Sequence, residues 1–324
     1  MRTKSAESVF TIGVDLGGTT TSFAIVDSSG KIIAKELIST RTSSVDEWAD
    51  NLSCGIEKLI VSSGIGGNIK GIGIGAPCAN AVTGCIEAAT DLPWKSPIPL
   101  AQMMEKRLGL PTTITNDANA AAIGEMAYGS ALGLKNFIVL TLGTGVGSGI
   151  VCDGHLLSGT RGFAGELGHM TFSFASDREC ACGRKGCLQT VASAKGIIET
   201  TRRLLRESDT PSSLRDIPAD ELSPLAVQQA ARDGDNIARE IYDFTGRCLG
   251  MAAAEFASIT DPEAIILFGG VSKAGDLLLN PMKEAFRQSV LHLYRDTVKL
   301  TVSGLRDADA AILGAASLPY LGQD

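Results

Sequence analysis

The chain has 324 residues, of which 44% are hydrophobic and 20% charged, and its formal net charge is −7. This length suggests about two domains, and an acidic balance with no long run of lysine or arginine argues against nucleic acid as a partner. The amino terminus is basic and then polar, without the apolar core of a signal peptide, and no apolar stretch has the length of a membrane span. We therefore expect a cytoplasmic protein that binds neither nucleic acid nor membrane, whose eight cysteines are thiols or metal ligands.

The amino-terminal part of the chain alternates apolar strands with helices of 3.6-residue periodicity. Glycine, proline and serine clusters mark the turns between these segments. The expected elements, in chain order, are strands at 9–15, 21–27 and 31–39, a helix at 45–63, a strand at 69–77, a long loop, a helix at 98–111, a strand at 112–117 and a helix of small residues at 118–131.

The remainder of the chain follows the same alternation. A strand, a tight turn and a second strand cover 138–151, and a cysteine-rich loop occupies 180–187. The later elements are helices over most of 190–260, a buried strand at 264–270 followed by a helix, a strand at 298–305 and a helix at 307–318. This order of elements indicates an α/β fold.

A strand–turn–strand segment occurs twice. At a constant offset, residues 15–19 (DLGGT) fall on residues 141–145 (TLGTG), and in each copy a second apolar run ends in aspartate. Glycines let the backbone turn sharply and bring bare N–H groups against a ligand. Two such turns facing each other would hold a polyphosphate, with Asp15 placed to bind Mg²⁺; plain hairpins are the alternative. The repeat predicts two related lobes with a cleft between them, and its spacing fits neither a P-loop nor a dinucleotide fingerprint.

Asn116 and Asp117 stand where a predicted strand ends and a helix begins. Functional carboxylates in α/β sheets lie at the carboxyl ends of strands. Phosphoryl transfer to an alcohol needs a residue that orients the hydroxyl and accepts its proton, and Asp117 fits that role. The competing interpretation is that Asp117 only caps the amino terminus of the helix.

One histidine and three cysteines have the spacing of a metal site. His169, Cys180, Cys182 and Cys187 would form a closed tetrahedral zinc site, which indicates a structural metal. Incidental cysteines are the alternative, and the polar loop around them disfavours it. Glu166 lies three residues before His169. Its carboxylate is either an acceptor for the hydroxyls of a polyhydroxyl ligand, a support for the metal site or a solvated side chain.

Segments spread over nearly the whole chain match one family. In order they read DLGGTTTSFAIVD, GIGIGAP, DLPW, TNDANAAAIGE, LGTGVGSGIV, GFAGELGHM, CACGRKGCLQTVAS and ILFGGVS. With these segments the chain resembles the ROK family of sugar kinases and sugar-responsive repressors, within the actin/hexokinase-type superfamily. The resemblance implies two duplicated, ribonuclease H-like α/β lobes that close on a hexose, with a zinc-binding loop and Asp117 as the catalytic base.

The resemblance also implies the ligands of the other motif residues. The residues that would face the sugar are Asn116, Asp117, Glu166 and His169. The residues that would bind ATP phosphates are Gly17, Gly18, Thr19, Thr144 and Gly145, with Asp15 beside them and the turn of Gly269 and Gly270 near the nucleoside.

The chain departs from the family pattern at three places. Gln189 stands two residues after the last cysteine, where the family usually has a glutamate that contacts the sugar, so the hydroxyl preference is expected to shift. Cys78 and Ala79 replace the usual Gly-Pro of a loop near the sugar, which makes Asn80 a candidate sugar contact. The first phosphate turn begins at Asp15, which leaves no space for the DNA-binding domain of the repressors.

We predict an ATP-dependent hexokinase of the glucokinase type, with Mg²⁺ bound to ATP and a structural Zn²⁺. The transferred group would go to the 6-hydroxyl of glucose. N-acetylglucosamine, N-acetylmannosamine or fructose as the substrate, and a sugar-sensing regulator without turnover, are the alternatives. The expected smaller lobe comprises 1–117 with 305–324 and the larger lobe 118–304. The family resemblance implies a homodimer or a higher homo-oligomer.

Overall fold

The structure is a computed structural model. The residues that it describes are 9–65, 68–88, 92–95, 97–305 and 307–321, so Asp91 of the DLPW segment lies outside them. The chain forms two compact units, each assembled from separate stretches. The first unit comprises Met1–Gly133, Leu156–Ala164 and Gly304–Asp324, and the second comprises Leu134–His155 and Gly165–Ser303.

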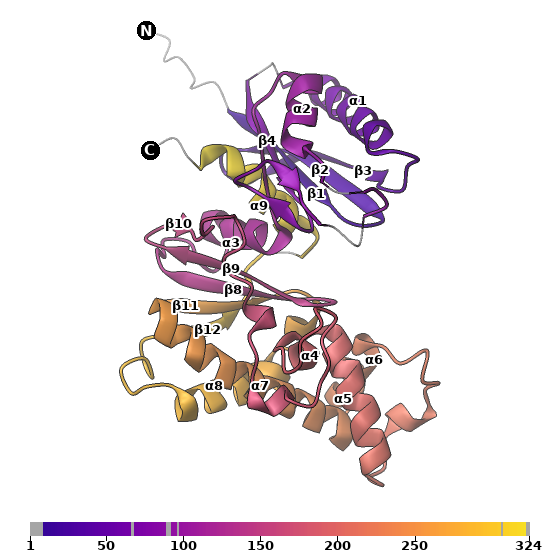
Figure 1. Ribbon diagram of the computed structural model, residues 1–324, viewed down its shortest axis with the longest axis vertical. Helices are drawn as coiled ribbons and strands as arrows, with labels where there is room; N and C mark the ends of the chain where they lie inside the picture. The colour runs from indigo at the N-terminus through magenta and orange to yellow at the C-terminus, as the bar shows by residue number, and fades with distance from the viewer. Residues whose placement is uncertain (1–8, 66–67, 89–91, 96, 306, 322–324) are drawn as a thin grey trace. The chain divides into compact units, whose positions relative to one another are not determined.

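The first unit is built on a five-stranded sheet in the order β3-β2-β1-β4-β7 (Figure 1). Its strands are β1 (Phe10–Leu16), β2 (Thr20–Asp27), β3 (Ile32–Ser39), β4 (Ile69–Gly75) and β7 (Thr112–Thr115). β2 pairs antiparallel with β1 and with β3, whereas β1, β4 and β7 run parallel. The carboxyl ends of the three parallel strands therefore meet at one edge. A short hairpin of β5 (Ala79–Asn80) and β6 (Cys85–Ile86) follows β4.

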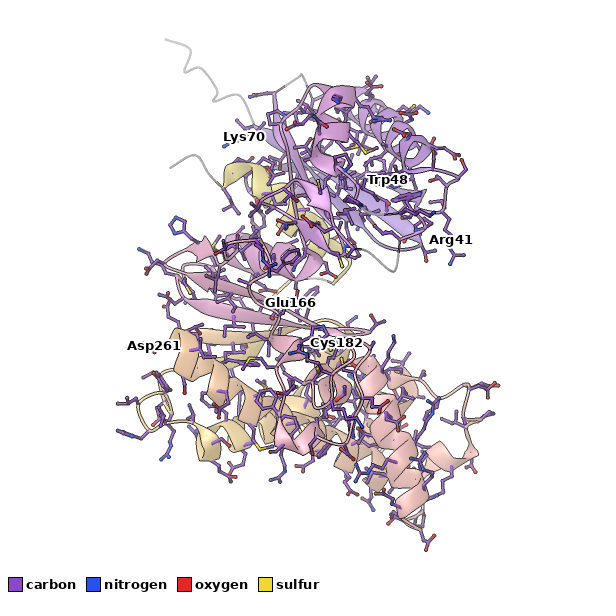
Figure 2. The ribbon with its side chains drawn as sticks, in the orientation of Figure 1. Arg41, Trp48, Lys70, Glu166, Cys182 and Asp261 are labelled. Atoms are coloured by element: carbon purple, nitrogen blue, oxygen red, sulfur yellow. The ribbon has the colours of Figure 1, made fainter. Side chains whose placement is uncertain are left out.

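Large side chains cover one face of this sheet. Ile12 of β1 and Phe23 of β2 are fully buried there, in a core shared with α1 (Val45–Ser63) and α2 (Leu100–Leu108). Trp48 of α1 belongs to this core (Figure 2). Its indole Nε1 donates a hydrogen bond of 2.9 Å to the hydroxyl of Thr21.

Small residues cover the opposite face. A Cβ atom on Gly13 of β1 would lie 2.2 Å from the carbonyl oxygen of Ile312, and one on Gly73 of β4 would lie 1.8 Å from that of Ala315. Both carbonyls belong to α9 (Asp307–Ser317). Glycine is required at these strand positions because the helix approaches the sheet at backbone distance.

Helix α3 (Asp117–Tyr128) packs against α9 and belongs to the first unit. A Cβ atom on Gly314 would lie 1.9 Å from the carbonyl oxygen of Ala120, so these two helices also touch through their backbones. The first unit consequently extends to Gly133, beyond the boundary predicted between residues 117 and 118. The difference arises because α3 is held by α9, which comes from the far end of the chain.

The second unit contains a sheet in the order β10-β9-β8-β11-β12. Its strands are β8 (Phe137–Leu142), β9 (Val146–Cys152), β10 (His155–Leu156), β11 (Ala264–Phe268) and β12 (Lys299–Val302). β8 is antiparallel to β9 and parallel to β11, and β11 is parallel to β12. The order of strands therefore repeats that of the first sheet, and so do the directions of these pairs.

The helices of the second unit follow its first hairpin. They are α4 (Gln189–Ala192), α5 (Ala194–Glu207), α6 (Pro224–Arg232), α7 (Asn236–Thr260) and α8 (Asp276–Ser289). α7 and α8 pack closely, because a Cβ atom on Gly250 of α7 would lie only 2.3 Å from the carbonyl oxygen of Met282. The mixed α/β class predicted from the alternation of elements is confirmed. Among the helices in the described residues, none combines the length and apolar character needed to cross a bilayer.

Candidate functional site

Two aspartates lie at the carboxyl edge of the first sheet. Asp15 near the end of β1 is in register with Gly75 of β4, and Gly75 is in register with Thr115 of β7. Asn116 and Asp117 follow directly after Thr115. The parallel pairing thus brings the two predicted functional carboxylates to the same edge, where ligands of α/β sheets bind.

Asn116, and not Asp117, is the cap of helix α3. The backbone of Asn116 is extended (φ −69°, ψ 161°), and its side-chain oxygen accepts the N–H of Asn119 at 2.7 Å. Asp117 is the first residue of the helix, and one carboxylate oxygen accepts the N–H of Ala118 at 2.9 Å. The interpretation of Asp117 as a mere N-cap is therefore wrong, because Asn116 occupies the cap position.

The pKa values of both carboxylates are raised. Desolvation raises the pKa of Asp15, the negative charge of Asp117 raises it further, and Lys35 opposes both effects. Desolvation by the surrounding protein atoms also raises the pKa of Asp117. The side chain of Asp117 is nevertheless exposed, so water reaches it and limits the shift. An accessible carboxylate with a raised pKa has the properties of a proton acceptor.

The turn between β1 and β2 is closed by the backbone. The N–H of Gly17 donates to the carbonyl of Thr20 at 3.1 Å, and the N–H of Thr40 donates to the carbonyl of Thr19 at 2.9 Å. Gly17 and Gly18 are half-buried, whereas Thr19 is exposed. The turn is thus a fixed loop beside Asp15, with a hydroxyl-bearing residue on its outer side.

Asn80, predicted as a sugar contact, is instead a buried structural residue. Only 1% of its surface is exposed. Its amide nitrogen donates to Glu87 Oε1 at 3.1 Å and to the carbonyl of Arg161 at 2.8 Å, and its oxygen accepts the N–H of Val82 at 2.9 Å. The Asn80 side chain thereby ties the segment Leu156–Ala164 to the rest of the first unit. These hydrogen bonds satisfy its amide without a ligand.

Two glycine turns of the second unit lie next to each other. Gly269 has a left-handed φ of 96°, and a Cβ atom there would lie 2.7 Å from the carbonyl oxygen of Leu142, so the turn after β11 touches the end of β8. A Cβ atom on Gly143 or on Gly270 would meet nothing within 4 Å. The backbone at Gly143 and at Gly270 therefore faces open space, which suits close approach by a ligand.

The backbone on both sides of Glu166 is fixed by a serine of β9. The hydroxyl of Ser148 donates to the carbonyl of Gly165 and accepts the N–H of Leu167 at 3.1 Å. The side chain of Glu166 is exposed (Figure 2). The sequence offered no sign of this role for Ser148 beyond its place in the repeat, since a serine in a strand has many uses.

The four predicted metal ligands come together. The candidate donor atoms of His169, Cys180, Cys182 and Cys187 all lie within 4.8 Å of one another. Cys182 Sγ is 3.6 Å from Cys187 Sγ, and Cys180 Sγ is 3.7 Å from His169 Nδ1. Ligands about 2.3 Å from a tetrahedral zinc ion are spaced about 3.8 Å apart, so both the donor set and the spacing fit zinc.

The pKa values of two cysteines in the cluster are shifted in opposite directions, since burial raises the pKa of Cys187 to about 12. The backbone N–H of Arg184 and then its side chain lower the pKa of Cys182 to about 6. The guanidinium of Arg184 donates to the carbonyl of His169 at 2.9 Å. Thiolates are the form in which cysteines bind metal, and Arg184 thus favours the ligating form of Cys182 while tying the two ends of the loop together.

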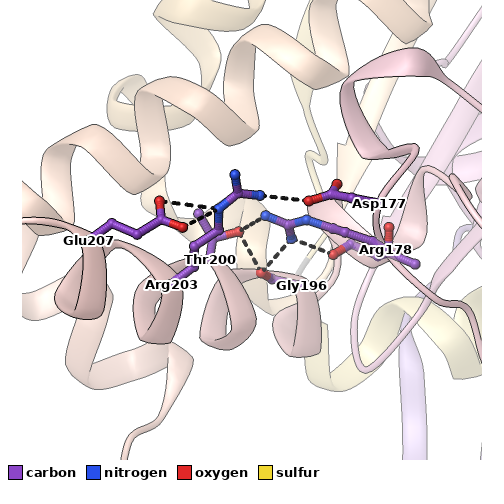
Figure 3. A network of polar contacts seen from close by, with 7 residues as sticks. Asp177, Arg178, Gly196, Thr200, Arg203 and Glu207 are labelled. Atoms are coloured by element: carbon purple, nitrogen blue, oxygen red, sulfur yellow. Dashed lines mark hydrogen bonds and ion pairs between the residues drawn. The ribbon is translucent and has the colours of Figure 1, made fainter.

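A buried arginine anchors this loop to the helices behind it. Arg178, only 9% exposed, donates to the carbonyl of Thr190 at 2.7 Å and to the hydroxyl of Thr200 at 2.9 Å (Figure 3). Beside it, Asp177 forms an ion pair of 2.9 Å with Arg203. Sequence reasoning missed Arg178, because a buried arginine has no signal that separates it from the surface arginines of a polar loop.

Comparison with known proteins gives the same family over most of the chain. The chain is 37% identical to a glucokinase of Halalkalibacterium halodurans, over 95% of this chain and 94% of that protein. It is similar to the crystal structure of a ROK family glucokinase from Streptomyces griseus in complex with glucose and AMPPNP, with a TM-score of 0.78, 31% identity and coverage of 97% and 100%. It is also similar to a ROK family transcriptional regulator, a homologue of the E. coli MLC protein, with a TM-score of 0.84, 27% identity and coverage of 96% of this chain and 77% of that one. Because the model of the ROK family matches residues 11–320, the chain belongs to the ROK family.

Proposed function

We propose that this protein is a glucokinase, which transfers the γ-phosphoryl group of ATP to the 6-hydroxyl of glucose. The observation that carries the proposal is the position of Asp117, an accessible carboxylate at the carboxyl edge of a parallel sheet that is not needed as the helix cap. The similarity to glucokinases over nearly the full length of both chains supports the same reaction.

Asp117 is the general base in this proposal. Its carboxylate orients the 6-hydroxyl and accepts the proton as the hydroxyl oxygen attacks the γ-phosphorus. The cap bond between Asn116 and Asn119 fixes the backbone at the start of α3, and the bond from Ala118 N–H orients one carboxylate oxygen. The base is therefore held in place before the substrate arrives. Fixing the reacting groups in this way lowers the entropic cost of the reaction.

We assign the sugar hydroxyls to the polar side chains that the family resemblance implies. Asn116 and Glu166 supply acceptors, and the ring of His169 turns Nδ1 toward Cys180, which leaves Nε2 for a hydroxyl. Gln189 has only its amide oxygen for a hydroxyl, because its nitrogen donates to Cys180. Polyhydroxyl ligands need several such partners, because each unpaired buried hydroxyl would cost binding energy. Asn80 is left out of this set, since its amide is already engaged.

The nucleotide phosphates are assigned to the glycine turns. The turn of Gly17, Gly18 and Thr19 is closed by the N–H of Gly17, and it offers the N–H groups of Gly18 and Thr19 and a hydroxyl. The turn of Thr144 and Gly145 is assigned the same role, and Gly270 offers an open backbone near the nucleoside. Mg²⁺ bound to ATP neutralises phosphate charge, and Asp15 is the carboxylate placed to hold it.

The remaining assignments concern architecture. We infer that the two units are duplicated lobes of the actin/hexokinase type, supported by their common order of strands. The cluster of His169, Cys180, Cys182 and Cys187 is assigned to a structural Zn²⁺ on the chemistry and spacing of its donors. A homodimer in the cytoplasm is proposed by analogy with the family, and the net charge of −7 supports the expectation that nucleic acid is not a partner.

A coupled assay of ADP formation across a panel of sugars tests the proposal. We expect the highest kcat/KM for glucose, with N-acetylglucosamine, N-acetylmannosamine and fructose well below it. A preference for an acetamido sugar or fructose would overturn the substrate while leaving the kinase in place. Sugar binding without turnover, measured by calorimetry, would overturn the enzyme assignment and favour a sugar-sensing regulator.

A further inference from the structure

The side chain of Gln189 joins two parts of the second unit. Its amide nitrogen donates to Cys180 Sγ at 3.0 Å. On the other side, its amide oxygen would lie 3.1 Å from a Cβ atom placed on Gly145, so the amide rests against the turn between β8 and β9. One half-buried amide thus contacts both the Cys/His cluster and the turn assigned to phosphate.

Helix α4 also connects the Cys/His cluster with this turn through its backbone. The helix begins at Gln189, two residues after the metal-ligand candidate Cys187, and the hydroxyl of Thr190 donates to the carbonyl of Cys187 at 2.7 Å. Just past its other end, the N–H of Ala194 donates to the carbonyl of Gly143 at 2.8 Å. A displacement of the cluster would therefore reach the turn both through the backbone and through Gln189.

The contact seen here uses the donor of the amide, which the glutamate usual in the family lacks. A cysteine that binds a metal is a thiolate, which accepts hydrogen bonds and repels negative charge. An amide supplies an N–H, whereas a carboxylate at the same position would place a second negative charge beside the sulfur. Partners in the outer shell of a metal site orient its ligands and tune its affinity.

We propose that Gln189 is a positioning residue: its hydrogen bond to the Cys180 sulfur holds the Cys/His cluster against the Gly143–Gly145 turn, so that metal occupancy of the cluster governs the binding of nucleotide phosphates. The inference rests on the proposed zinc site and on the proposed nucleotide role of that turn. The new element is the link between the zinc site and the turn, which neither assignment contains.

The metal arm of the test compares Gln189→Glu and Gln189→Met with the parent protein. Zinc affinity is measured by competition with a chromophoric chelator, and cobalt is substituted for zinc to record the sulfur-to-cobalt absorption band. We expect zinc affinity to fall roughly 10- to 100-fold in Gln189→Glu and by a smaller factor in Gln189→Met. The sulfur-to-cobalt absorption band should shift in both variants. Gln229→Glu, the same change at an exposed site on α6, is the matched control and should alter neither quantity.

The nucleotide arm measures the Kd of a non-hydrolysable ATP analogue with zinc bound and after its removal. In the parent, removal of zinc should weaken binding, and in Gln189→Met the Kd should depend much less on zinc. Unchanged zinc affinity and an unchanged band in both variants would overturn the proposal, as would a parent Kd that is independent of zinc. Failure of the zinc-loaded parent to bind the analogue at all would instead refute the kinase assignment, while the metal arm still tests the bond to Cys180.

Discussion

Replacing Asp117 by asparagine separates its proposed catalytic role from a structural one. The amide keeps the size of the side chain and can still accept the N–H of Ala118, which donates to the carboxylate at 2.9 Å. The cap of α3 is untouched, because Asn116 provides it. The substitution therefore removes the proton acceptor with little change to the fold, and kcat should fall by roughly 10² to 10⁴, the usual contribution of a general base.

Dependence on pH gives a second readout. The pKa of Asp117 is raised from the ordinary value of 3.8, so the parent should lose kcat/KM on the acid side at a pH above 3.8, where the carboxylate becomes protonated. Because the folded pKa exceeds the unfolded one, ionisation of Asp117 weakens the folded state as pH rises past 3.8. The asparagine variant should thus have a Tm at neutral pH equal to or above that of the parent, with any advantage lost towards pH 3.8.

Steady-state kinetics, glucose calorimetry and thermal melts at several pH values form the assay. Asp46→Asn, on the exposed face of α1, is the matched control for an aspartate-to-asparagine change and should keep its activity. A kcat for Asp117→Asn within about threefold of the parent would show that Asp117 is not the base, since at least ~10²-fold is expected. A lower Tm would show that the carboxylate supports the fold.

Three further changes test other parts of the structure. Cys182→Ser should reduce zinc from about one ion per chain and lower the Tm, although Cys182 is exposed; full zinc by elemental analysis in the variant would contradict the site. Gly270→Ala should leave the free energy of unfolding within about 0.5 kcal/mol of the parent, as for other surface changes, because a Cβ atom there meets nothing within 4 Å. The same change should raise the KM for ATP and not the KM for glucose. An unchanged KM for ATP would remove Gly270 from the nucleotide site. Gly314→Ala should cost about 1–3 kcal/mol in urea unfolding, since its Cβ atom would lie 1.9 Å from a carbonyl oxygen of α3; equal stability would contradict the close helix contact.

Features with local causes could be predicted from the sequence. The strands of both sheets other than β10 follow from apolar runs between turn residues, and the Cys/His cluster follows from a spacing that only a compact loop satisfies. The pair Asn116 and Asp117 was located, but both residues are common caps, and only the backbone angles show that Asn116 is the one that caps.

Features with distant causes could not be predicted. The boundary placed after residue 117 differs from the structure because α3 packs on α9, whose position no local pattern reveals. The sequence predicts Asn80 as a sugar contact because its loop lies near the sugar in relatives, whereas its amide binds groups of the first unit that include the carbonyl of Arg161, far along the chain. Arg178 escaped notice for the same reason, since its partners at Thr190 and Thr200 define its role.

The close fit of α9 on the glycine face of the first sheet has a consequence for biosynthesis. Strands β1 and β4 leave the ribosome early, but the helix that covers Gly13 and Gly73 is encoded near the end of the chain. All segments of the second unit emerge before that helix. The nascent chain can therefore complete the second unit while the sheet of the first still shows a bare backbone face to water and to chaperones. The glycine face of β1 and β4 is thus covered only by a helix that is synthesised after every segment of the second unit.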